Sequence, residues 1–459
     1  MTTTIDLCFI GAGPAGMAAA IEACALGLSV LVLDEAADAG GQIWRDIARA
    51  TSQRLRSLGP DYAKGRVQYD VFKGCGCDYR PSSTVWHIEA LEPGFKLSVS
   101  GPAGSYTVDA TRLLVATGAL ERPMPLPGWT LPGVTTAGAL QILLKSSSVV
   151  APDAVLVGAG PLLYLIASQM VAAGQPPRAI VETVPKENWR KALPHVPRAL
   201  GALGYLRKGL AMKRVLARAG VPIHKDARDI TLEGADALEA VSFTSGGRRQ
   251  RILTTSAALH HGVIPNAQIT RLMRCDHLWD AGQHCFRPVL DDWGETSCKG
   301  LYVAGDGGGI FGAASAVLSG RIAAIGIARA AGKFAGNAVP LRTALARDAR
   351  IRPFLETLYA PAAQALVPQD DTLICRCEEI TAGRLRAAIS ANAPGPNQLK
   401  SFLRVGMGPC QGRVCGLAVT QMIVNQRGIA PDQAGYFRIR PPLKPLSLSE
   451  LAAINPDSP

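Results

Sequence analysis

Four cysteines near the C-terminal end of the chain form two close pairs. One residue separates the members of the first pair and four residues separate those of the second, and the thiols belong to Cys375, Cys377, Cys410 and Cys415. Glycine-bearing loops that present four thiolates are suited to holding a metal. Structural zinc usually takes its ligands in pairs at two- to four-residue spacing, so a Cys-x-Cys pair favours a [2Fe–2S] cluster. Zinc is the second interpretation, and four unliganded cysteines are the third.

A glycine motif near the N-terminus has the spacing of a pyrophosphate-binding turn. Residues 11–16 are Gly-Ala-Gly-Pro-Ala-Gly, and they follow an apolar segment at 5–10 that is expected to be a strand. In such a turn Gly11 provides the tight bend and Gly13 lets the pyrophosphate approach the backbone. Gly16 allows the following helix to pack closely on the strand, and the helix N-terminus faces the phosphates.

The same strand–helix–strand unit offers further contacts to the nucleotide. Pro14 and Ala15 begin the helix, where a proline loses no needed N–H group. An acidic residue about 20 positions after the glycines is expected to bind the adenosine ribose. Asp34 is the preferred candidate, and Glu35 is the alternative.

Three later segments indicate that the bound nucleotide is FAD. Gly41 and Gln42 lie in a loop of the kind that approaches the isoalloxazine ring in flavoproteins. A second segment ends a strand where the chain leaves the FAD domain, and a third resembles the late motif whose aspartate contacts the flavin ribityl and pyrophosphate groups. The candidate contacts in these two segments are Ala116, Thr117, Gly118, Gly305 and Asp306. All four motifs occur in the order that an FAD domain requires.

A second unit of the same kind begins about 150 residues later. It contains Gly158 and Gly160, but Leu163 replaces the third glycine, and Glu182 stands where a ribose-binding acid belongs. Two interpretations remain: a second dinucleotide or adenine-nucleotide site, and a retained fold whose site is empty or blocked. Leu163 argues against hydride transfer from a nicotinamide, and Glu182 disfavours the 2′-phosphate of NADP.

These units predict an α/β protein with two Rossmann-like dinucleotide-binding domains of the glutathione and thioredoxin reductase type, plus a small C-terminal cysteine-rich module. The expected divisions are a discontinuous FAD domain at 1–145 and 262–335, a second nucleotide domain at 146–261, a linker at 336–368, a [2Fe–2S] module at 369–440 and a tail at 441–459.

Composition narrows the class of protein. The net charge is +12 and the isoelectric point is near 9.3, but aromatic residues make up only 5% and no nucleic-acid-binding motif accompanies the charge. No apolar run reaches the roughly 18 residues of a membrane span, and no signal peptide is evident. Eleven cysteines without such a peptide favour a reducing compartment. We therefore expect a cytoplasmic protein that neither binds nucleic acid nor spans a membrane.

The motifs together resemble one family, the FAD-containing alpha subunits of bacterial heteromeric amine and opine dehydrogenases. That family includes the A subunits of octopine and nopaline oxidase and the related subunits of hydrogen cyanide synthase and of dye-linked proline and hydroxyproline dehydrogenases. The resemblance covers nearly the whole chain and is carried by residues 116–134, 305–310 and 408–415.

The resemblance implies an electron-transfer role within a complex. A separate flavoprotein beta subunit, similar to D-amino-acid oxidase, would oxidise the C–N bond, and electrons would pass to the FAD and the cluster of this chain. Some complexes of the family hold FMN where two subunits meet, and a small third subunit is a further expectation. The cysteine module resembles bacterioferritin-associated ferredoxin but has four residues, not two, between Cys410 and Cys415. The rival hypotheses are a stand-alone NAD(P)H-dependent flavoprotein reductase and a redox-silent scaffold.

Overall fold

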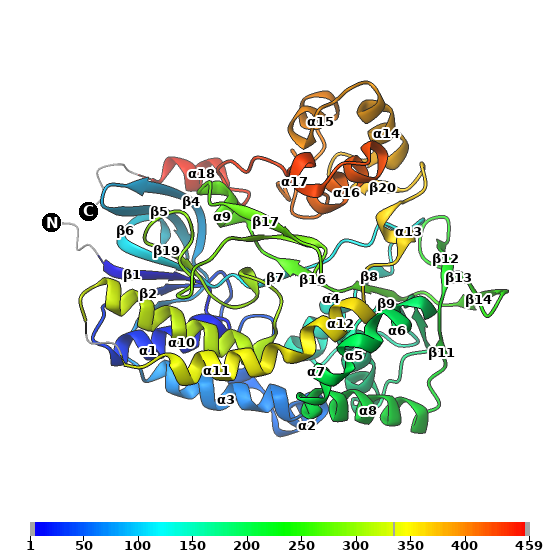
Figure 1. The fold of residues 1–459 in the computed structure, drawn as a ribbon, viewed down its shortest axis with the longest axis horizontal. Helices are drawn as coiled ribbons and strands as arrows, with labels where there is room; N and C mark the ends of the chain where they lie inside the picture. The colour runs from blue at the N-terminus through cyan, green and yellow to red at the C-terminus, as the bar shows by residue number, and fades with distance from the viewer. Residues whose placement is uncertain (1–4, 334–335, 455–459) are drawn as a thin grey trace.

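The computed structural model of the chain describes residues 5–333 and 336–454. Figure 1 shows two α/β units side by side and a small helical module at the top of the view. The chain passes from the first unit to the second and back again, so each unit combines segments that are far apart in the sequence.

The first unit is built on a seven-stranded sheet in the order β3-β2-β1-β6-β5-β4, with β19 also paired to β6. The central strand β1 is parallel to both of its neighbours. The parallel strands β1 and β2 are mostly buried and rich in Val, Leu and Ile, as is typical of the centre of a parallel sheet. The strands are β1 (Ile5–Ile10), β2 (Val30–Leu33), β3 (Asp78–Arg80), β4 (Thr84–Leu91), β5 (Gly94–Gly101), β6 (Gly104–Val115) and β19 (Leu301–Val303).

Two long helices of the first unit pack tightly on each other. These are α1 (Pro14–Ala25) and α10 (Ala313–Ala330), and a Cβ on Gly320 would lie only 2.2 Å from the carbonyl oxygen of Ala15. The length and hydropathy of α10 would also suit a membrane-spanning helix. Its buried face against α1 accounts for its apolar composition, as in the core helix of an α/β domain. Two further helices, α2 (Ser52–Leu58) and α3 (Pro60–Lys73), complete this face.

The second unit has a parallel five-stranded sheet in the order β11-β10-β9-β15-β8, and a three-stranded antiparallel sheet lies beside it. The strands of the two sheets are β8 (Val134–Thr136), β9 (Val155–Ala159), β10 (Ala179–Glu182), β11 (Ile223–His224), β12 (Arg228–Glu233), β13 (Ala240–Ser245), β14 (Arg248–Leu253) and β15 (Ala257–His261). The helices are α4 (Ala137–Ser147), α5 (Pro161–Ala172), α6 (Lys186–Ala192), α7 (Val196–Leu200) and α8 (Leu203–Arg218).

The first domain boundary lies earlier than the sequence predicts. β8 forms the edge of the second sheet, because Val134 is paired with Ala257 of β15. The crossing between the units is marked by the antiparallel pair β7 (Ala119–Glu121) and β16 (Val263–Pro265). The boundary expected at residue 145 therefore falls inside α4, after β8 has already joined the second unit. A three-residue strand is too short to show a periodic pattern.

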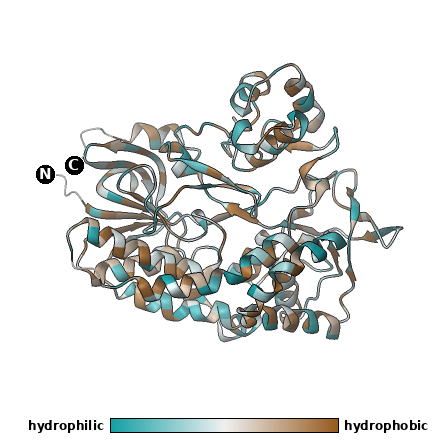
Figure 2. Ribbon diagram, in the orientation of Figure 1, coloured by the Kyte–Doolittle hydropathy of each residue, from teal (hydrophilic) through white to brown (hydrophobic). Residues whose placement is uncertain are grey.

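Helix α8, which carries Arg207, Lys208, Lys213, Arg214 and Arg218, forms a solvated face of the second unit. Of the sixteen residues of α8, only Leu216 is fully buried. Figure 2 shows hydrophilic and hydrophobic residues interleaved along this helix at the lower edge of the view. The contacts of α8 include an ion pair of 2.7 Å between Lys208 and Asp61 of α3, which links the two units.

The segment predicted as a linker is mostly helical and packed. Its helices are α11 (Val339–Asp348), α12 (Arg352–Leu358) and α13 (Ala363–Leu366). Leu358 is buried together with Ala192 of α6, so α12 lies against the second unit. The side chain of Gln364 exchanges two hydrogen bonds, of 3.0 and 2.8 Å, with the backbone of Ile230. The segment predicted as a linker is therefore helical at these residues and packs against the second unit.

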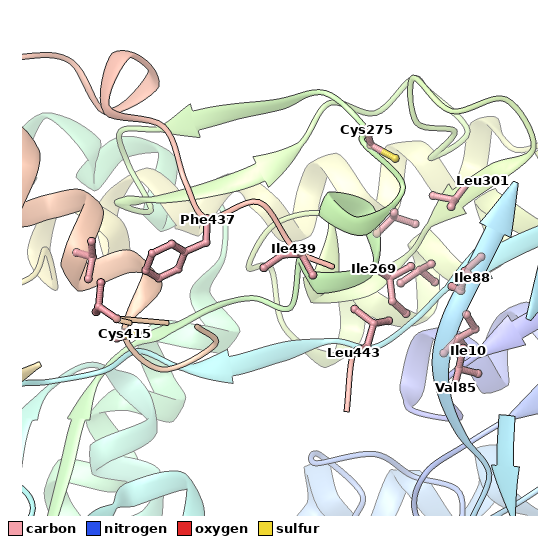
Figure 3. Packing of buried hydrophobic residues seen from close by; sticks show 14 of the residues in the cluster. Ile10, Val85, Ile88, Ile269, Cys275, Leu301, Cys415, Phe437, Ile439 and Leu443 are labelled. Atoms are coloured by element: carbon pink, nitrogen blue, oxygen red, sulfur yellow. The ribbon is translucent and has the colours of Figure 1, made fainter. Parts of the chain in front are cut away.

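The C-terminal module and tail continue the core of the first unit. The module contains β20 (Leu373–Cys375), β21 (Ile380–Thr381), α14 (Ala382–Ser390), α15 (Pro396–Leu403), α16 (Gly416–Arg427) and α17 (Pro431–Ala434). Figure 3 shows Cys415 and Phe437 in the same apolar cluster as Ile269 and Val85 of the first unit. The N–H of Leu443 donates a 2.7 Å hydrogen bond to Trp86 of β4, and α18 (Leu448–Ala452) follows. The described part of the predicted tail, residues 441–454, is thus packed along the sheet of the first unit. Residues 455–459 lie outside the described residues.

Candidate functional site: a flavin fold and a four-thiol module

The first glycine motif closes tightly around the end of β1. Gly11 has a φ of +106°, and its N–H donates a 2.8 Å hydrogen bond to Leu33. A Cβ on Gly11 would lie 2.6 Å from the carbonyl oxygen of Ala116, and a Cβ on Gly16 would lie 1.9 Å from the carbonyl oxygen of Gly11. Only glycine fits at these two positions, as the pyrophosphate-binding turn of a dinucleotide fold requires.

Gly13 and Pro14 place the N-terminus of α1 beside this turn. Gly13 is the N-cap residue and Pro14 begins the helix, and no side chain of the described residues caps it. The first N–H groups of the helix are therefore directed at the space beside the turn, where an anion can accept hydrogen bonds from them. Ala15 is buried behind the turn and forms part of the contact with α10.

Asp34 is fixed at the end of β2 by two backbone N–H groups. Its Oδ2 accepts a 2.5 Å hydrogen bond from Ala12, and its Oδ1 accepts a 2.7 Å hydrogen bond from Ala36. Burial raises the pKa of Asp34, and these two hydrogen bonds oppose the rise. The carboxylate lies beside the glycine turn with lone pairs left for ribose hydroxyls. Glu35 instead forms an exposed ion pair of 2.7 Å with Lys444, so the geometry favours Asp34 as the ribose ligand.

The loop with Gly41 and Gln42 folds back onto the same turn. The N–H of Gly40 donates a 2.8 Å hydrogen bond to Ala12. A Cβ on Gly41 would lie 2.9 Å from Cα of Gly13, and Gly41 has a φ of +58°. The two glycine segments together therefore form a cradle of bare backbone, which fits the close approach of a dinucleotide.

Lys145 of α4 holds this loop, although the sequence motifs did not reveal it. Its Nζ donates hydrogen bonds of 2.8 Å to the carbonyl oxygen of Gln42 and 2.9 Å to Oε1 of Gln141. The chain of contacts continues from Gln141 to Gln169 of α5 at 2.9 Å. Burial lowers the pKa of Lys145 to about 7. Gln141 and Lys145 lie four residues apart on a mostly apolar helix. That spacing places both side chains on one face and is the feature of the sequence that indicates a polar contact there.

The segments after β6 and β19 lie next to each other near this turn. The carbonyl oxygen of Gly118 accepts a 2.9 Å hydrogen bond from Asn266, and the hydroxyl of the adjacent Thr117 is 3.5 Å from the carbonyl oxygen of Asn266. Gly305 begins the turn after β19, where a Cβ would lie 2.9 Å from Cβ of Ala15. The structure thus brings the late motif against the first helix, as an FAD domain requires.

Asp306 organises the loop before α10. Its Oδ1 accepts two hydrogen bonds of 2.9 Å, from the N–H groups of Phe311 and Gly312. The sequence predicts a flavin contact for Asp306, and the structure shows that one of its oxygens serves the backbone. A role for the other oxygen toward the flavin stays a prediction.

The second glycine motif is folded, but side chains of the protein fill it. Leu163, which replaces the third glycine, is completely buried. The hydroxyl of Tyr164 donates a 2.5 Å hydrogen bond to Oε1 of Glu182, the acid expected to bind a ribose. A Cβ on Gly158 would lie 1.7 Å from the carbonyl oxygen of His260, and one on Gly160 would lie 3.2 Å from the His260 ring. Gly158 thus approaches neighbouring backbone as Gly11 does in the first motif, and the difference between the two motifs lies in Leu163 and in the Tyr164–Glu182 hydrogen bond.

Residues of α12 and the segment after it cover this motif. Leu358 shares an apolar cluster with Ala159 of the glycine motif, and Phe354 and Tyr359 pack against the cluster. Burial, and after it the nearby Glu182, raise the pKa of Tyr359. These contacts favour the blocked-site interpretation over a second nucleotide.

The two adjacent histidines, His260 and His261, are both buried and hydrogen-bonded. Nδ1 of His260 is hydrogen-bonded to Glu121, and Nε2 of His261 accepts a 2.5 Å hydrogen bond from the N–H of Ala362. Burial, helped by the positive charge of Arg122, lowers the pKa of His261 to about 3. The neutral ring of His261 therefore joins the segment after α12 to β15 of the second unit.

The structure brings all four predicted thiols together, in two hydrogen-bonded pairs. Cys375 pairs with Cys415 and Cys377 pairs with Cys410. The hydrogen bond with Cys415, assisted by backbone N–H groups, lowers the pKa of Cys375 to about 6. A Cβ on Gly408 would lie 2.2 Å from Cβ of Cys377, so this loop requires a glycine.

The four thiols supply the ligand set that a [2Fe–2S] cluster requires, namely four cysteine thiolates. They lie close to one another, since Cys415 interacts with Cys375, Cys377 and Cys410.

Trp129 connects the thiol module to the crossing between the two units. Its Nε1 donates a 2.7 Å hydrogen bond to the carbonyl oxygen of Leu373, two residues before Cys375. The guanidinium of Arg376 lies 5.4 Å from the centre of the Trp129 ring. The Cys375–Cys377 loop is therefore anchored on the crossing between the two α/β units through both its backbone and its side chains.

Comparison with known proteins agrees with this geometry. Residues 5–332 match the pyridine nucleotide-disulphide oxidoreductase family, and residues 373–425 match the BFD-like [2Fe-2S] binding domain. The A subunit of opine oxidase from Rhizobium meliloti is 43% identical over 98% of this chain and 87% of its own length. The HcnB subunit of hydrogen cyanide synthase from Pseudomonas protegens is 33% identical over 96% of each chain.

A solved structure shows the same fold over nearly all of the chain. L-proline dehydrogenase from P. horikoshii superposes with a TM-score of 0.72 at 18% identity, over 98% of this chain and 80% of that one. The resemblance predicted from the motifs is confirmed by the full-length relatives. On the strength of that identity, together with the flavin-type fold and the four-thiol module, the chain belongs to the family of opine oxidase A subunits and their relatives.

Proposed function

We propose that this chain is the electron-transfer subunit of a heteromeric oxidase that acts on an opine or a related amino acid. The observation that carries the proposal is the single apolar core that joins the flavin-type unit to the four-thiol module. Electron transfer between two cofactors requires them to be close and held rigidly. The names of the relatives with 43% identity support the substrate class.

FAD and a [2Fe–2S] cluster are the proposed cofactors. FAD would be held by the glycine cradle, with its ribose at Asp34 and its flavin end toward the Gln42 loop. The four thiols would hold the cluster. When bound, the flavin exchanges electrons in pairs and the cluster exchanges them singly. In this proposal the glycine cradle and Asp34 orient the nucleotide, and the four thiols hold the cluster next to the shared apolar core.

The substrate would be oxidised on a partner. We propose a beta subunit similar to D-amino-acid oxidase, with FMN at the interface between the two proteins and with a small third subunit in the complex. The relatives are themselves subunits of larger enzymes by name. The histidines at the crossing between the units are engaged in structural hydrogen bonds, which supports a site of oxidation elsewhere. Free thiols at all eleven cysteines suit a reducing, cytoplasmic setting.

A stand-alone NAD(P)H-dependent reductase is less well supported. It would require a nicotinamide nucleotide at the second glycine motif. There the hydroxyl of Tyr164 is bonded to Glu182, and Leu358 packs on the motif.

Reconstitution tests the proposal. The purified chain, loaded with FAD and cluster, is assayed anaerobically with an artificial dye and with octopine, nopaline, proline or glycine. We expect little dye reduction by the chain alone. Addition of a D-amino-acid-oxidase-like subunit from the same organism should restore turnover with one of these substrates. The restored turnover should depend on flavin in both chains. Substantial dye reduction by the single chain with any of these amines would refute the proposed division of labour.

A further inference from the structure

A small cavity lies at the junction between the first unit and the thiol module. One side is formed by β7, β16 and α9 (Gln268–Leu272), and the other by Arg413, Leu417 of α16 and Tyr436. The cavity volume is about 20 Å³. On the same measure a single water molecule needs about 10–15 Å³. The space therefore suits the polar end of a small molecule, and it is too small for a nucleotide.

Two side chains of α9 line this cavity with polar atoms that have no partner among the described residues. Gln268 is only 7% exposed, and its Oε1 accepts no hydrogen bond from that part of the chain. Nη2 of Arg271 is also buried and donates none to it. Buried polar atoms are almost always hydrogen-bonded, and an unpaired one lowers stability. The pair thus offers one donor and one acceptor on neighbouring turns of a helix.

The cavity is also positively charged. Arg413 is a second guanidinium in its wall, and Nη1 of Arg413 donates a 2.7 Å hydrogen bond to Leu443. Among the described residues, no acidic side chain lines the cavity. The guanidinium carbon of Arg271 lies 4.8 Å from the ring centre of Phe286 and 4.2 Å from that of Tyr436. These cation–π contacts offset part of the cost of burying the charge, and an anion would offset the rest.

We propose that this cavity is a binding site for a small 2-hydroxycarboxylate. Its carboxylate accepts hydrogen bonds from Arg271, whose planar guanidinium matches the geometry of a carboxylate. Its hydroxyl group donates to Oε1 of Gln268. Ile264 and Leu417 contribute apolar atoms to the same wall, and only the polar end of the ligand enters the cavity. Arg413 supplies positive charge from the thiol module, so the bound anion bridges the two parts of the chain.

The site goes beyond the electron-transfer function, because it requires neither a partner protein nor turnover. Its test uses the full chain with FAD and cluster bound. Glycolate is the probe, acetate is the analogue without a hydroxyl group, and chloride is the control for ionic strength. Binding is measured by calorimetry and by the shift in Tm. We expect saturable binding of glycolate, weaker binding of acetate, and no saturable effect of chloride at the same concentration.

Variants separate the two contacts. Arg271→Gln should weaken glycolate binding by about tenfold or more, as expected for loss of a charged hydrogen bond. Gln268→Leu should reduce glycolate binding to the level of acetate, and it should leave acetate binding unchanged. Arg274→Gln is the matched control, because Arg274 is exposed just beyond the same helix. FAD and iron content verify that each variant is folded. Equal binding of glycolate to wild type and Arg271→Gln, or no saturable binding at millimolar glycolate, would overturn the proposal.

Discussion

The hydroxyl of Tyr164 donates a 2.5 Å hydrogen bond to Glu182 inside the second unit. In a working dinucleotide site this acid would face the ribose. Here both residues are buried, and Tyr359 lies close enough to Glu182 for the carboxylate to raise the pKa of Tyr359 after the effect of burial. The acid of the second glycine motif therefore belongs to the packing of the protein.

The first prediction follows from this relationship. NADH and NADPH should not reduce the bound flavin at a rate typical of a reductase, because side chains of the protein fill the second motif. Anaerobic stopped-flow mixing, followed by flavin absorbance, measures the rate. Bleaching faster than about 1 per second, within the ordinary range of kcat, would contradict the prediction. Dithionite serves as the control, since it should reduce the flavin without using a nucleotide site.

Loss of one thiol should remove the cluster and leave the flavin. We expect wild-type protein purified anaerobically to contain FAD with two irons and two labile sulfides per chain. Cys410→Ser should abolish the iron and sulfide while FAD stays bound, because Cys410 lies outside the glycine cradle. Cys298→Ser, which alters a thiol outside the module, should keep both cofactors. Zinc in place of iron in fresh wild-type protein would contradict the electron-transfer proposal.

Asp34 and Glu35 form a matched pair for testing FAD binding. In Asp34→Asn, the amide nitrogen cannot accept a hydrogen bond, so one of the N–H groups of Ala12 and Ala36 loses its acceptor. FAD should dissociate about tenfold more readily or worse, as expected when a charged hydrogen bond is lost. Glu35→Gln should bind FAD normally, since Glu35 only pairs with Lys444 at the surface. Recovery of flavin fluorescence on dilution provides the measurement.

His261 should make the protein sensitive to acid. Burial lowers the pKa of His261 to about 3, below its unfolded value of about 6.5. The unfolded chain therefore binds a proton between about pH 6.5 and 3 that the folded chain does not. The contribution of neutral His261 to the free energy of unfolding is fully present above about pH 6.5. It falls as the pH decreases from about 6.5 to 3, by at most about 1.4 kcal/mol per pH unit.

The variant His261→Gln should show a shallower decline of stability with falling pH. Urea unfolding at a series of pH values between about 4 and 7 gives the slopes, which are compared in place of absolute stabilities. His195→Gln is the control, because His195 is only partly buried just before α7. An unchanged slope in His261→Gln would show that another group carries the acid sensitivity. His277 is one such group, since burial lowers its pKa to about 4.

The glycine motifs could be located from the sequence because their function depends on local backbone geometry. Gly11 and Gly16 pack directly against neighbouring backbone atoms, so their spacing is visible in any chain that folds this way. The cysteine pairs are equally local. The arrangement of all four thiols then follows from the antiparallel pair β20–β21 and from α16, which begins directly after Cys415.

Contacts between distant segments could not be predicted in this way. The short strand β8 joins the second sheet only because β15, far along the chain, offers it an edge. Likewise, nothing in the local sequence of α12 indicates that Leu358 packs on Ala159. The roles of Lys145 and Arg271 likewise depend on contacts with distant residues, Gln42 and Tyr436, which the local sequence does not indicate.

The apolar cluster that runs from Val85 through Leu443 to Phe437 has a consequence for the autonomy of the thiol module. A module on a flexible tether could swing between electron donor and acceptor, and it could be cut away or grafted onto another enzyme. Here, removal of the module would expose apolar residues of the first unit to solvent, and exposed apolar surface promotes aggregation. We therefore expect the first unit and the thiol module to unfold together. A change of partner subunit should be tolerated more readily than replacement of the thiol module.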